Sequence, residues 1–347
     1  MKKGIWSIGL LLLLWTGCAM APPLENPSER GLAVLERVEL NGSRQWITIR
    51  TRDPENPVLL FLAGGPGGSE LPSTRMHLGA LENSFTVVNW DQPGAGKSAG
   101  AVARRQLTPD RYVRDGIALI DYLTGRFGKE KVYILGESWG TILGIRLCQA
   151  VPEKIAAYAG SGQMVNTTEN DVRGYRFALD ILKNTGREKD RERLSEQGPP
   201  PYMRGNIALK YQRYMGVLNG WMNRQTAGLG EDHDILKDAL RAPEYTPADR
   251  VRWILALMRT FNRVYPQLEE VDFLTQAPSL EVPCYFILGR YDVNAYTDYV
   301  EEYAGILKAP HREIIWFENS GHPPLYSESE KLVRTMERIL REQEPGA

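Results

Sequence analysis

The chain of 347 residues is long enough for one large domain or for one domain with a sizeable insertion. Hydrophobic residues make up 42% and charged residues 24%, the composition of a folded globular protein rather than a disordered one. A formal net charge of -1 leaves no basic surplus for nucleic-acid binding. The three cysteines and four histidines form no CxxC motif or Cys/His cluster, which excludes a disulfide scaffold and a cysteine zinc site.

The first residues predict an export signal. Two lysines precede an apolar run that ends at Trp15 and is too short to span a bilayer core of about 30 Å. We predict a signal peptide over 1–17 and a polar, Pro-rich tether over 18–30, with Cys18 as the lipidated residue of a membrane-anchored cell-envelope lipoprotein. The alternative is ordinary secretory cleavage after Ala21, which would give a periplasmic or secreted protein.

Short apolar runs bounded by turn residues predict the strands of an α/β sheet. The expected strands are 45–51, 57–63, 85–90, 131–136 and 155–160. Residues 58–62 are apolar without alternation, as in a strand covered on both faces of a parallel sheet. Helical spacing over 109–127 and 139–150 places helices between strands. Residues 31–164 are therefore predicted as the first part of an α/β core.

The strand-helix alternation stops at about residue 165. Residues 165–276 contain helical patterns but no convincing buried strand, and we predict a helical cap inserted into the core. Alternation resumes with strands at 282–288 and 313–317 and ends in a helix over about 327–341. Residues 277–347 are thus predicted as the second part of the core.

A serine nucleophile is predicted at Ser138. Residues 136–140 read Gly-Glu-Ser-Trp-Gly and match G-x-S-x-G between a buried strand and a helix. In this context the serine occupies a strained turn that projects its hydroxyl outward, and the small residues keep the neighbouring segments from colliding.

A serine hydroxyl needs a base to take its proton, and the base needs a carboxylate to hold its tautomer. On this kind of strand-turn-helix the chain order is Ser, acid, His. Asp292 follows the expected strand at 282–288, and His322 lies in the loop after 313–317. We therefore predict a catalytic triad of Ser138, Asp292 and His322.

Acyl transfer also needs hydrogen-bond donors for the developing oxyanion. A glycine-rich loop follows the strand at 58–62, and the backbone N–H of Gly65, with Gly64 as the alternative, would join that of Trp139. The turn at 91–98 ends in Gly-Lys-Ser, but it begins with Asp where a phosphate-binding loop needs Gly. Because no metal-ligand spacing appears either, we predict neither a nucleotide site nor a metal site.

Together these residues resemble the α/β-hydrolase superfamily and, more narrowly, the proline iminopeptidase (prolyl aminopeptidase) family of serine peptidases. That family has His-Gly-Gly-Pro-Gly where residues 63–67 read Ala-Gly-Gly-Pro-Gly. It has Asp-Gln-Arg-Gly-x-Gly-x-Ser where residues 91–98 carry Pro for Arg, and Gly-Gly-Ser-Trp-Gly where residues 136–140 carry Glu for Gly. The resemblance covers most of 45–162 and 282–325, and it implies the same triad, a helical cap and no cofactor.

The departures from the family concern the substrate. Ala63 replaces the family's His, and the cap stretch whose Glu binds the substrate's amino terminus is absent. An aminopeptidase must neutralise a buried ammonium with carboxylates. Glu169 and Asp171, at the start of the cap, are the candidates for this role.

Three functions fit the sequence. The leading one is an aminopeptidase that releases N-terminal residues from small peptides through an acyl-enzyme. The second is a carboxylesterase-type α/β hydrolase that acts on neutral acyl substrates with the same triad. The third is a non-catalytic envelope binding protein. The expected partner is a small peptide or acyl substrate, and the oligomeric state is left open.

Overall fold

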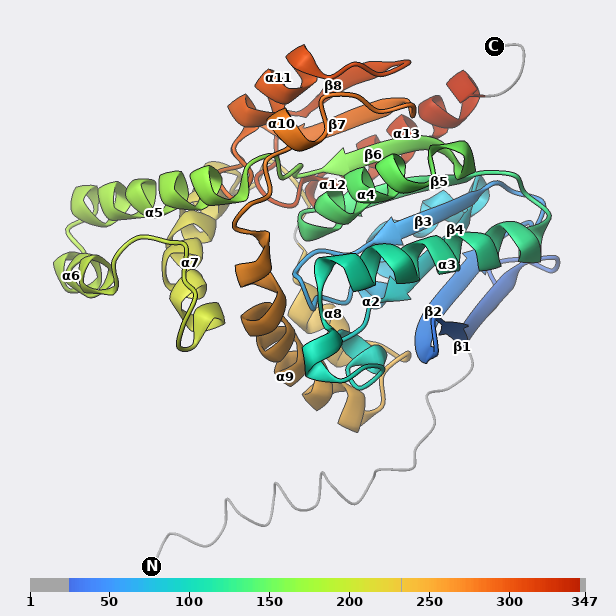
Figure 1. Ribbon diagram of the computed structural model, residues 1–347, viewed down its shortest axis with the longest axis horizontal. Helices are drawn as coiled ribbons and strands as arrows, with labels where there is room; N and C mark the ends of the chain where they lie inside the picture. The colour runs from blue at the N-terminus through green and yellow to red at the C-terminus, as the bar shows by residue number, and fades with distance from the viewer. Residues whose placement is uncertain (1–24, 232, 344–347) are drawn as a thin grey trace, which may run out of the picture.

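An eight-stranded sheet forms the centre of the computed structural model, which describes residues 25–231 and 233–343 (Figure 1). The spatial order is β1-β2-β4-β3-β5-β6-β7-β8. The strands are β1 (Leu32–Leu40), β2 (Ser43–Thr51), β3 (Val58–Leu62), β4 (Thr86–Asp91), β5 (Val132–Glu137), β6 (Ile155–Ser161), β7 (Cys284–Gly289) and β8 (Arg312–Phe317). β2 pairs antiparallel with β1 and β4, and the pairs from β4 to β8 are parallel. The predicted α/β class with a mostly parallel sheet is confirmed.

Helices follow most strands. Those outside the predicted cap are α2 (Leu71–His77), α3 (Pro109–Phe127), α4 (Trp139–Ala150), α11 (Thr297–Ile306), α12 (Pro324–Ser327) and α13 (Ser329–Gln343). The side chains of β3 alternate between the two faces of the sheet. Leu59 and Phe61 pack in one cluster with α13, and Leu60 and Leu62 pack in another with α3 and α4. Both faces of the central strands are therefore covered, as the unbroken apolar run predicts.

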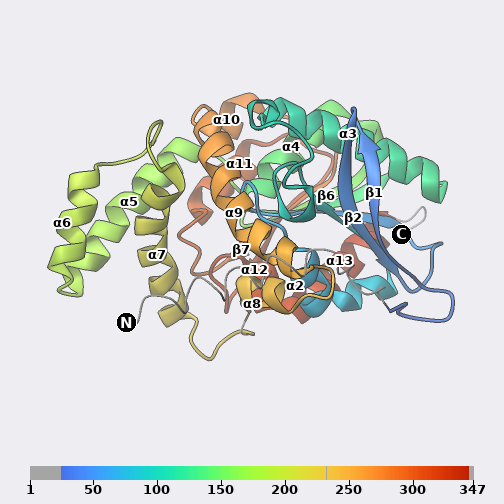
Figure 2. The same ribbon diagram turned by 90° about the horizontal axis from the view of Figure 1, so that it is seen from below.

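The chain between β6 and β7 is helical. It contains α5 (Thr167–Asn184), α6 (Glu188–Gln197), α7 (Ile207–Gln225), α8 (Ile235–Arg241), α9 (Pro247–Val264) and α10 (Phe273–Gln276). Figure 2 shows α5, α6 and α7 at the end of the molecule away from β1 and β2. α8 packs against α2, and α9 packs against the turn that follows β4. In the part of the chain that the structure describes, no helix is long and apolar enough to cross a membrane.

The strand β1 adds an edge to the predicted sheet. Its sequence carries Glu36, Arg37 and Glu39, so apolar patterning does not mark it as a buried strand. The structure pairs β1 with β2 alone, at the end of the sheet. Charged side chains are tolerated there because one side of an edge strand faces water.

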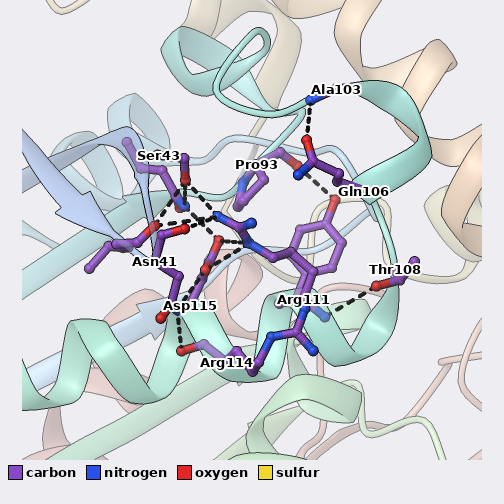
Figure 3. A network of polar contacts seen from close by, with 12 residues as sticks. Asn41, Ser43, Pro93, Ala103, Gln106, Thr108, Arg111, Arg114 and Asp115 are labelled. Carbon is purple, nitrogen blue, oxygen red and sulfur yellow. Dashed lines mark hydrogen bonds and ion pairs between the residues drawn. The ribbon is translucent and has the colours of Figure 1, made fainter.

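A buried ion pair fixes the β1–β2 hairpin to α3 (Figure 3). Arg111 Nε donates to both carboxylate oxygens of Asp115 at 2.8 Å, and Arg111 Nη2 donates to Ser43 Oγ at 2.8 Å. Asp115 also accepts a hydrogen bond of 2.9 Å from Asn41 Nδ2. Because both charges are paired and further hydrogen bonded, these contacts offset the desolvation penalty of burying them.

Candidate active site

Ser138 occupies the sharp turn between β5 and α4. Its backbone has φ +50° and ψ −115°, a conformation that non-glycine residues rarely adopt and that costs about 1–3 kcal/mol. The Ser138 N–H donates to the carbonyl oxygen of Ser161 at 3.0 Å, which ties the turn to the end of β6. Such strain persists where the surrounding structure holds it in place, and it is concentrated at functional sites.

The glycines of this turn allow a close approach of neighbouring segments. A Cβ atom at Gly140 would lie 2.0 Å from the carbonyl oxygen of Leu62, and one at Gly136 would lie 2.7 Å from the carbonyl oxygen of Gly140. Both contacts are with backbone, which cannot move aside as a flexible side chain can. The G-x-S-x-G pattern is therefore required for α4 to start directly against β3 and β5.

Asp292 follows β7, His322 follows β8, and the two side chains are hydrogen bonded. His322 Nδ1 lies 2.8 Å from Asp292 Oδ2. The other carboxylate oxygen of Asp292 accepts the backbone N–H groups of Asn294 and Ala295 at 2.8 and 2.9 Å. The carboxylate is thus fixed from two sides, and it holds His322 with the proton on Nδ1.

The polar partner of the second ring nitrogen is Glu137. His322 Nε2 lies 3.3 Å from Glu137 Oε1, and within the described chain Ser138 Oγ makes no hydrogen bond to Nε2. Burial acts to lower the pKa of His322, but Asp292 and Glu137 outweigh it and raise that pKa well above its usual 6.5. From the sequence, Glu137 stands out only as a charged residue in place of the resembled family's glycine.

The glycine-rich loop after β3 also lies beside Ser138. The Gly64 N–H donates to Glu70 Oε1 at 2.8 Å, so a side chain already occupies this predicted oxyanion donor. Gly65 lines the cavity beside Ser138. Trp139 opens α4, where backbone N–H groups have no intrahelical partner. Of the three predicted donors, Gly64 thus already has a partner, and Gly65 and Trp139 line the cavity together with Ser138.

The core and the helices between β6 and β7 together line a cavity of about 140 Å³. The core contributes Ser138 and His322, and the cap contributes apolar side chains such as Phe261 from α9 and Met215 from α7. A larger cavity of about 720 Å³ lies beside it, and both are lined by Trp139, Ile142 and Leu268.

Comparison with known proteins agrees with this geometry. A family model described as "Serine aminopeptidase, S33" matches residues 80–330, more than half of the chain. The chain belongs to the serine aminopeptidase family. It is a hydrolase of the α/β-hydrolase fold, and the predicted resemblance to the proline iminopeptidase group is confirmed.

Individual relatives of this serine aminopeptidase family member differ in how closely they match. The probable aminopeptidase YbaC of Bacillus subtilis (strain 168) is 28% identical over 317 residues, which cover 91% of this chain and 98% of the relative. The structure of a proline iminopeptidase from Mycobacterium smegmatis has a TM-score of 0.62 at 18% identity, covering 89% of this chain and 98% of that one. An epoxide hydrolase from Vigna radiata has a TM-score of 0.59 at 22% identity with the same coverage. At these identities the two structures show that the fold is shared. The reaction has to be argued from the residues of the site.

The structure does not bring the predicted amine-binding residues of the cap to the cavity. Glu169 is exposed in the first turn of α5. Asp171 is 2% exposed, and its carboxylate accepts the hydroxyl groups of Tyr214 and Tyr265 at 3.1 and 3.0 Å. Tyr265 lines the cavity and lies between it and Asp171. Helical periodicity places both carboxylates near the cap entrance, but only packing decides that one faces water and the other faces tyrosines.

Asp171 should make the stability of this serine aminopeptidase family member depend on pH. Burial raises the pKa of Asp171 from 3.8 to about 7, against the effect of the tyrosine hydrogen bonds. Ionising the carboxyl then costs free energy in the folded state, so the wild type loses stability relative to an Asp171→Asn variant as pH rises from about 4 to about 7. Urea unfolding of both proteins across this range measures the difference. A difference that does not change with pH would show that Asp171 ionises as readily in the folded as in the unfolded protein.

Proposed function

We propose that this protein is a serine aminopeptidase that releases small N-terminal residues from peptides through an acyl-enzyme on Ser138. The observation that carries the proposal is the placement of Ser138 and His322 on the wall of one cavity, with Asp292 bonded to the far nitrogen of His322. Membership of the serine aminopeptidase family supports the reaction class. The relative from Bacillus subtilis is named a probable aminopeptidase and matches this chain over 98% of its own length. It supports the same reaction class.

The proposed reaction has two halves. Ser138 Oγ attacks the carbonyl carbon of the N-terminal residue, its proton passes to His322 Nε2, and the oxyanion accepts the N–H groups of Gly65 and Trp139. The amide C–N bond breaks, the leaving amine takes the proton from Nε2, and the ester to Ser138 remains. Water then gives a proton to Nε2 and attacks the ester, and the proton returns to Ser138 as the free amino acid leaves.

The cavity favours a small acyl group that carries N–H donors. Its volume of about 140 Å³ is well below the roughly 300–1,000 Å³ of pockets for larger ligands. Two oxygens of cavity-lining residues, Thr167 Oγ1 and Asn294 Oδ1, have no hydrogen-bond partner within the described chain. Buried oxygens without partners are costly, and a substrate amine can donate to both of them, whereas an ester can only accept a hydrogen bond from the Thr167 hydroxyl.

The test is a comparison of amide and ester hydrolysis by the purified protein. Prolyl, alanyl and leucyl amides of one chromogenic amine are assayed beside their N-acetylated forms and a short-chain ester of a comparable reporter. We expect cleavage of the free-amine amides, with loss of turnover on acetylation and in a Ser138→Ala variant. Turnover of the ester alone would assign the protein to the esterases, and absence of any serine-dependent turnover would favour a binding protein.

We further propose that the protein acts in the cell envelope. The signal peptide over 1–17 and the lipidation site Cys18 lie outside the described residues and stay predictions from the sequence. Metabolic labelling with a fatty-acid probe, compared between the full chain and a Cys18→Ala variant, tests the anchor. Unlabelled protein cleaved after Ala21 would favour ordinary secretion.

A further inference from the structure

Two buried carboxyl groups meet beside the triad, and the reaction as written does not use them. Glu137 and Glu70 are each 4% exposed, and a carboxyl oxygen of each lies against Gly64. Glu70 also accepts the Gly64 N–H at 2.8 Å and the Tyr326 hydroxyl at 2.6 Å. Burial and the charge of Glu137 raise the pKa of Glu70 to about 8. At neutral pH Glu70 therefore keeps its proton, and the two carboxyl groups are not two adjacent negative charges.

The contact with Glu137 engages Nε2 of His322, the nitrogen that must accept the proton of Ser138. His322 Nε2 lies 3.3 Å from Glu137 Oε1. A bare ring nitrogen and a carboxylate oxygen are both acceptors, so an attractive contact between them requires a proton on the line that joins them. With that proton in place, Nε2 has no lone pair to take the proton of Ser138. Something must draw Glu137 away from His322 before the reaction can start.

The carboxylate of Glu137 also disfavours the reaction of a neutral substrate. A Cβ atom at Gly64 would lie 1.8 Å from Glu137 Oε2 and 3.3 Å from Glu70 Oε1, so both carboxyl groups converge on the residue next to Gly65. The oxyanion is expected at the Gly65 N–H. An unpaired carboxylate this close would oppose the development of negative charge there. A cation bound between them would remove the opposition.

A substrate with a free amino terminus supplies that cation at the right place. Its α-ammonium nitrogen is two bonds from the carbonyl carbon that Ser138 attacks, and Glu137 is the residue next to Ser138 in the chain. Among the residues predicted for this role, Glu169 is exposed and Asp171 is enclosed by tyrosine hydroxyls. Glu137 is the carboxylate in direct contact with a residue of the triad besides Asp292.

We propose that Glu137, backed by Glu70, binds the α-ammonium group of the substrate, and that it holds His322 Nε2 until such an amine takes its place. The proposal rests on the proposed aminopeptidase function and names the residue that makes it specific for free amines. When the ammonium pairs with Glu137, the proton between Glu137 and Nε2 is lost to water, and Nε2 becomes free to accept the proton of Ser138. Neutral or N-acetylated substrates cannot make this exchange.

The experiment compares Glu137→Gln with the wild type on matched substrates. Glutamine keeps the shape and can donate to the neighbouring oxygens, but it carries no charge. We expect kcat/KM for the prolyl or alanyl amide to fall about 100-fold, as when one partner of a buried charge pair is removed. Hydrolysis of the short-chain ester should hold or rise, and labelling of Ser138 by a fluorophosphonate should be at least as fast as in the wild type. Glu169→Gln, which changes an exposed cap carboxylate, is the matched control and should leave the amide-to-ester ratio unchanged.

Equal losses on the amide and the ester, or slower labelling, would overturn the proposal, because Glu137 would then support the triad rather than restrain it. An unchanged amide-to-ester ratio would overturn it as well. Failure of the proposed function looks different, since the wild type itself would then cleave the ester and not the amides. If Glu137→Gln does not fold, Glu137→Asp gives the test. Aspartate keeps the charge but withdraws it by one methylene, so kcat/KM for the amides should fall while ester hydrolysis holds, and an unchanged amide-to-ester ratio in the folded variant would contradict the assignment.

Discussion

A Ser138→Ala variant is expected to lose about 10⁴- to 10⁶-fold in kcat on any amide that the wild type cleaves. Alanine removes the only atom that forms the acyl bond and leaves the oxyanion donors and the cavity in place. Alanine, like serine, has a Cβ atom, so the strain of the backbone at φ +50° is the same in both proteins. The free energy of unfolding should therefore change little. Stopped and continuous assays with the chromogenic amide, together with urea unfolding, measure both quantities.

Ser161→Ala is a matched control for this variant. Ser161 ends β6 beside the nucleophile, and its hydroxyl is buried without a hydrogen-bond partner in the described chain. Its carbonyl oxygen, which accepts the Ser138 N–H, is retained in alanine. The control should keep its activity. A Ser138→Ala protein that keeps most of its turnover would show that another group is the nucleophile.

An Asp292→Asn variant is expected to lose about 10⁴-fold in kcat with little change in KM. The asparagine oxygen can still accept the backbone N–H groups of Asn294 and Ala295, which now hold Asp292 Oδ1. Its amide nitrogen would then face His322 Nδ1 as a donor. The ring would have to carry its proton on Nε2, and that tautomer cannot take the proton of Ser138.

Asp298→Asn controls for the loss of one charge near the site. Asp298 lies in the first turn of α11 and forms an exposed ion pair with Arg173, an interaction worth little in water. Its removal should leave kcat within the error of the assay. If Asp292→Asn were equally active, Asp292 would not be the residue that orients His322, and Glu137 would be the next carboxylate to replace.

Several parts of the fold could be predicted because the local sequence carries the information. The apolar run at 58–62 has no polar residue to leave in water, so it becomes the central strand β3. The elbow at 136–140 can be recognised because a helix can start against a strand there only if glycines remove the Cβ contacts. The starts of α5 at Thr167 and α9 at Pro247 follow from the local sequence as well, since Asn166 and Thr246 supply capping oxygens.

Other parts could not be predicted because they depend on contacts between distant segments. β1 is a strand through its pairing with β2, although its own pattern is charged. Glu169 and Asp171 are two positions apart on one helix, and only packing against α7 and the turn that follows α9 decides that Asp171 is enclosed by tyrosines. Glu70 acquires a role through a hydrogen bond to Gly64 and contact with Glu137, which no spacing in the sequence indicates.

The sequence by itself thus determined the α/β class, the strand ends that carry Ser138, Asp292 and His322, and the family to which the chain belongs. These follow from local rules, because burial, turn geometry and chain order leave their mark on neighbouring residues. Only the tertiary structure decided which carboxylate meets the second nitrogen of His322. Charge acts through space over a few ångströms, and residues 70, 137 and 322 come within that range only when β3, β5 and β8 lie in one sheet.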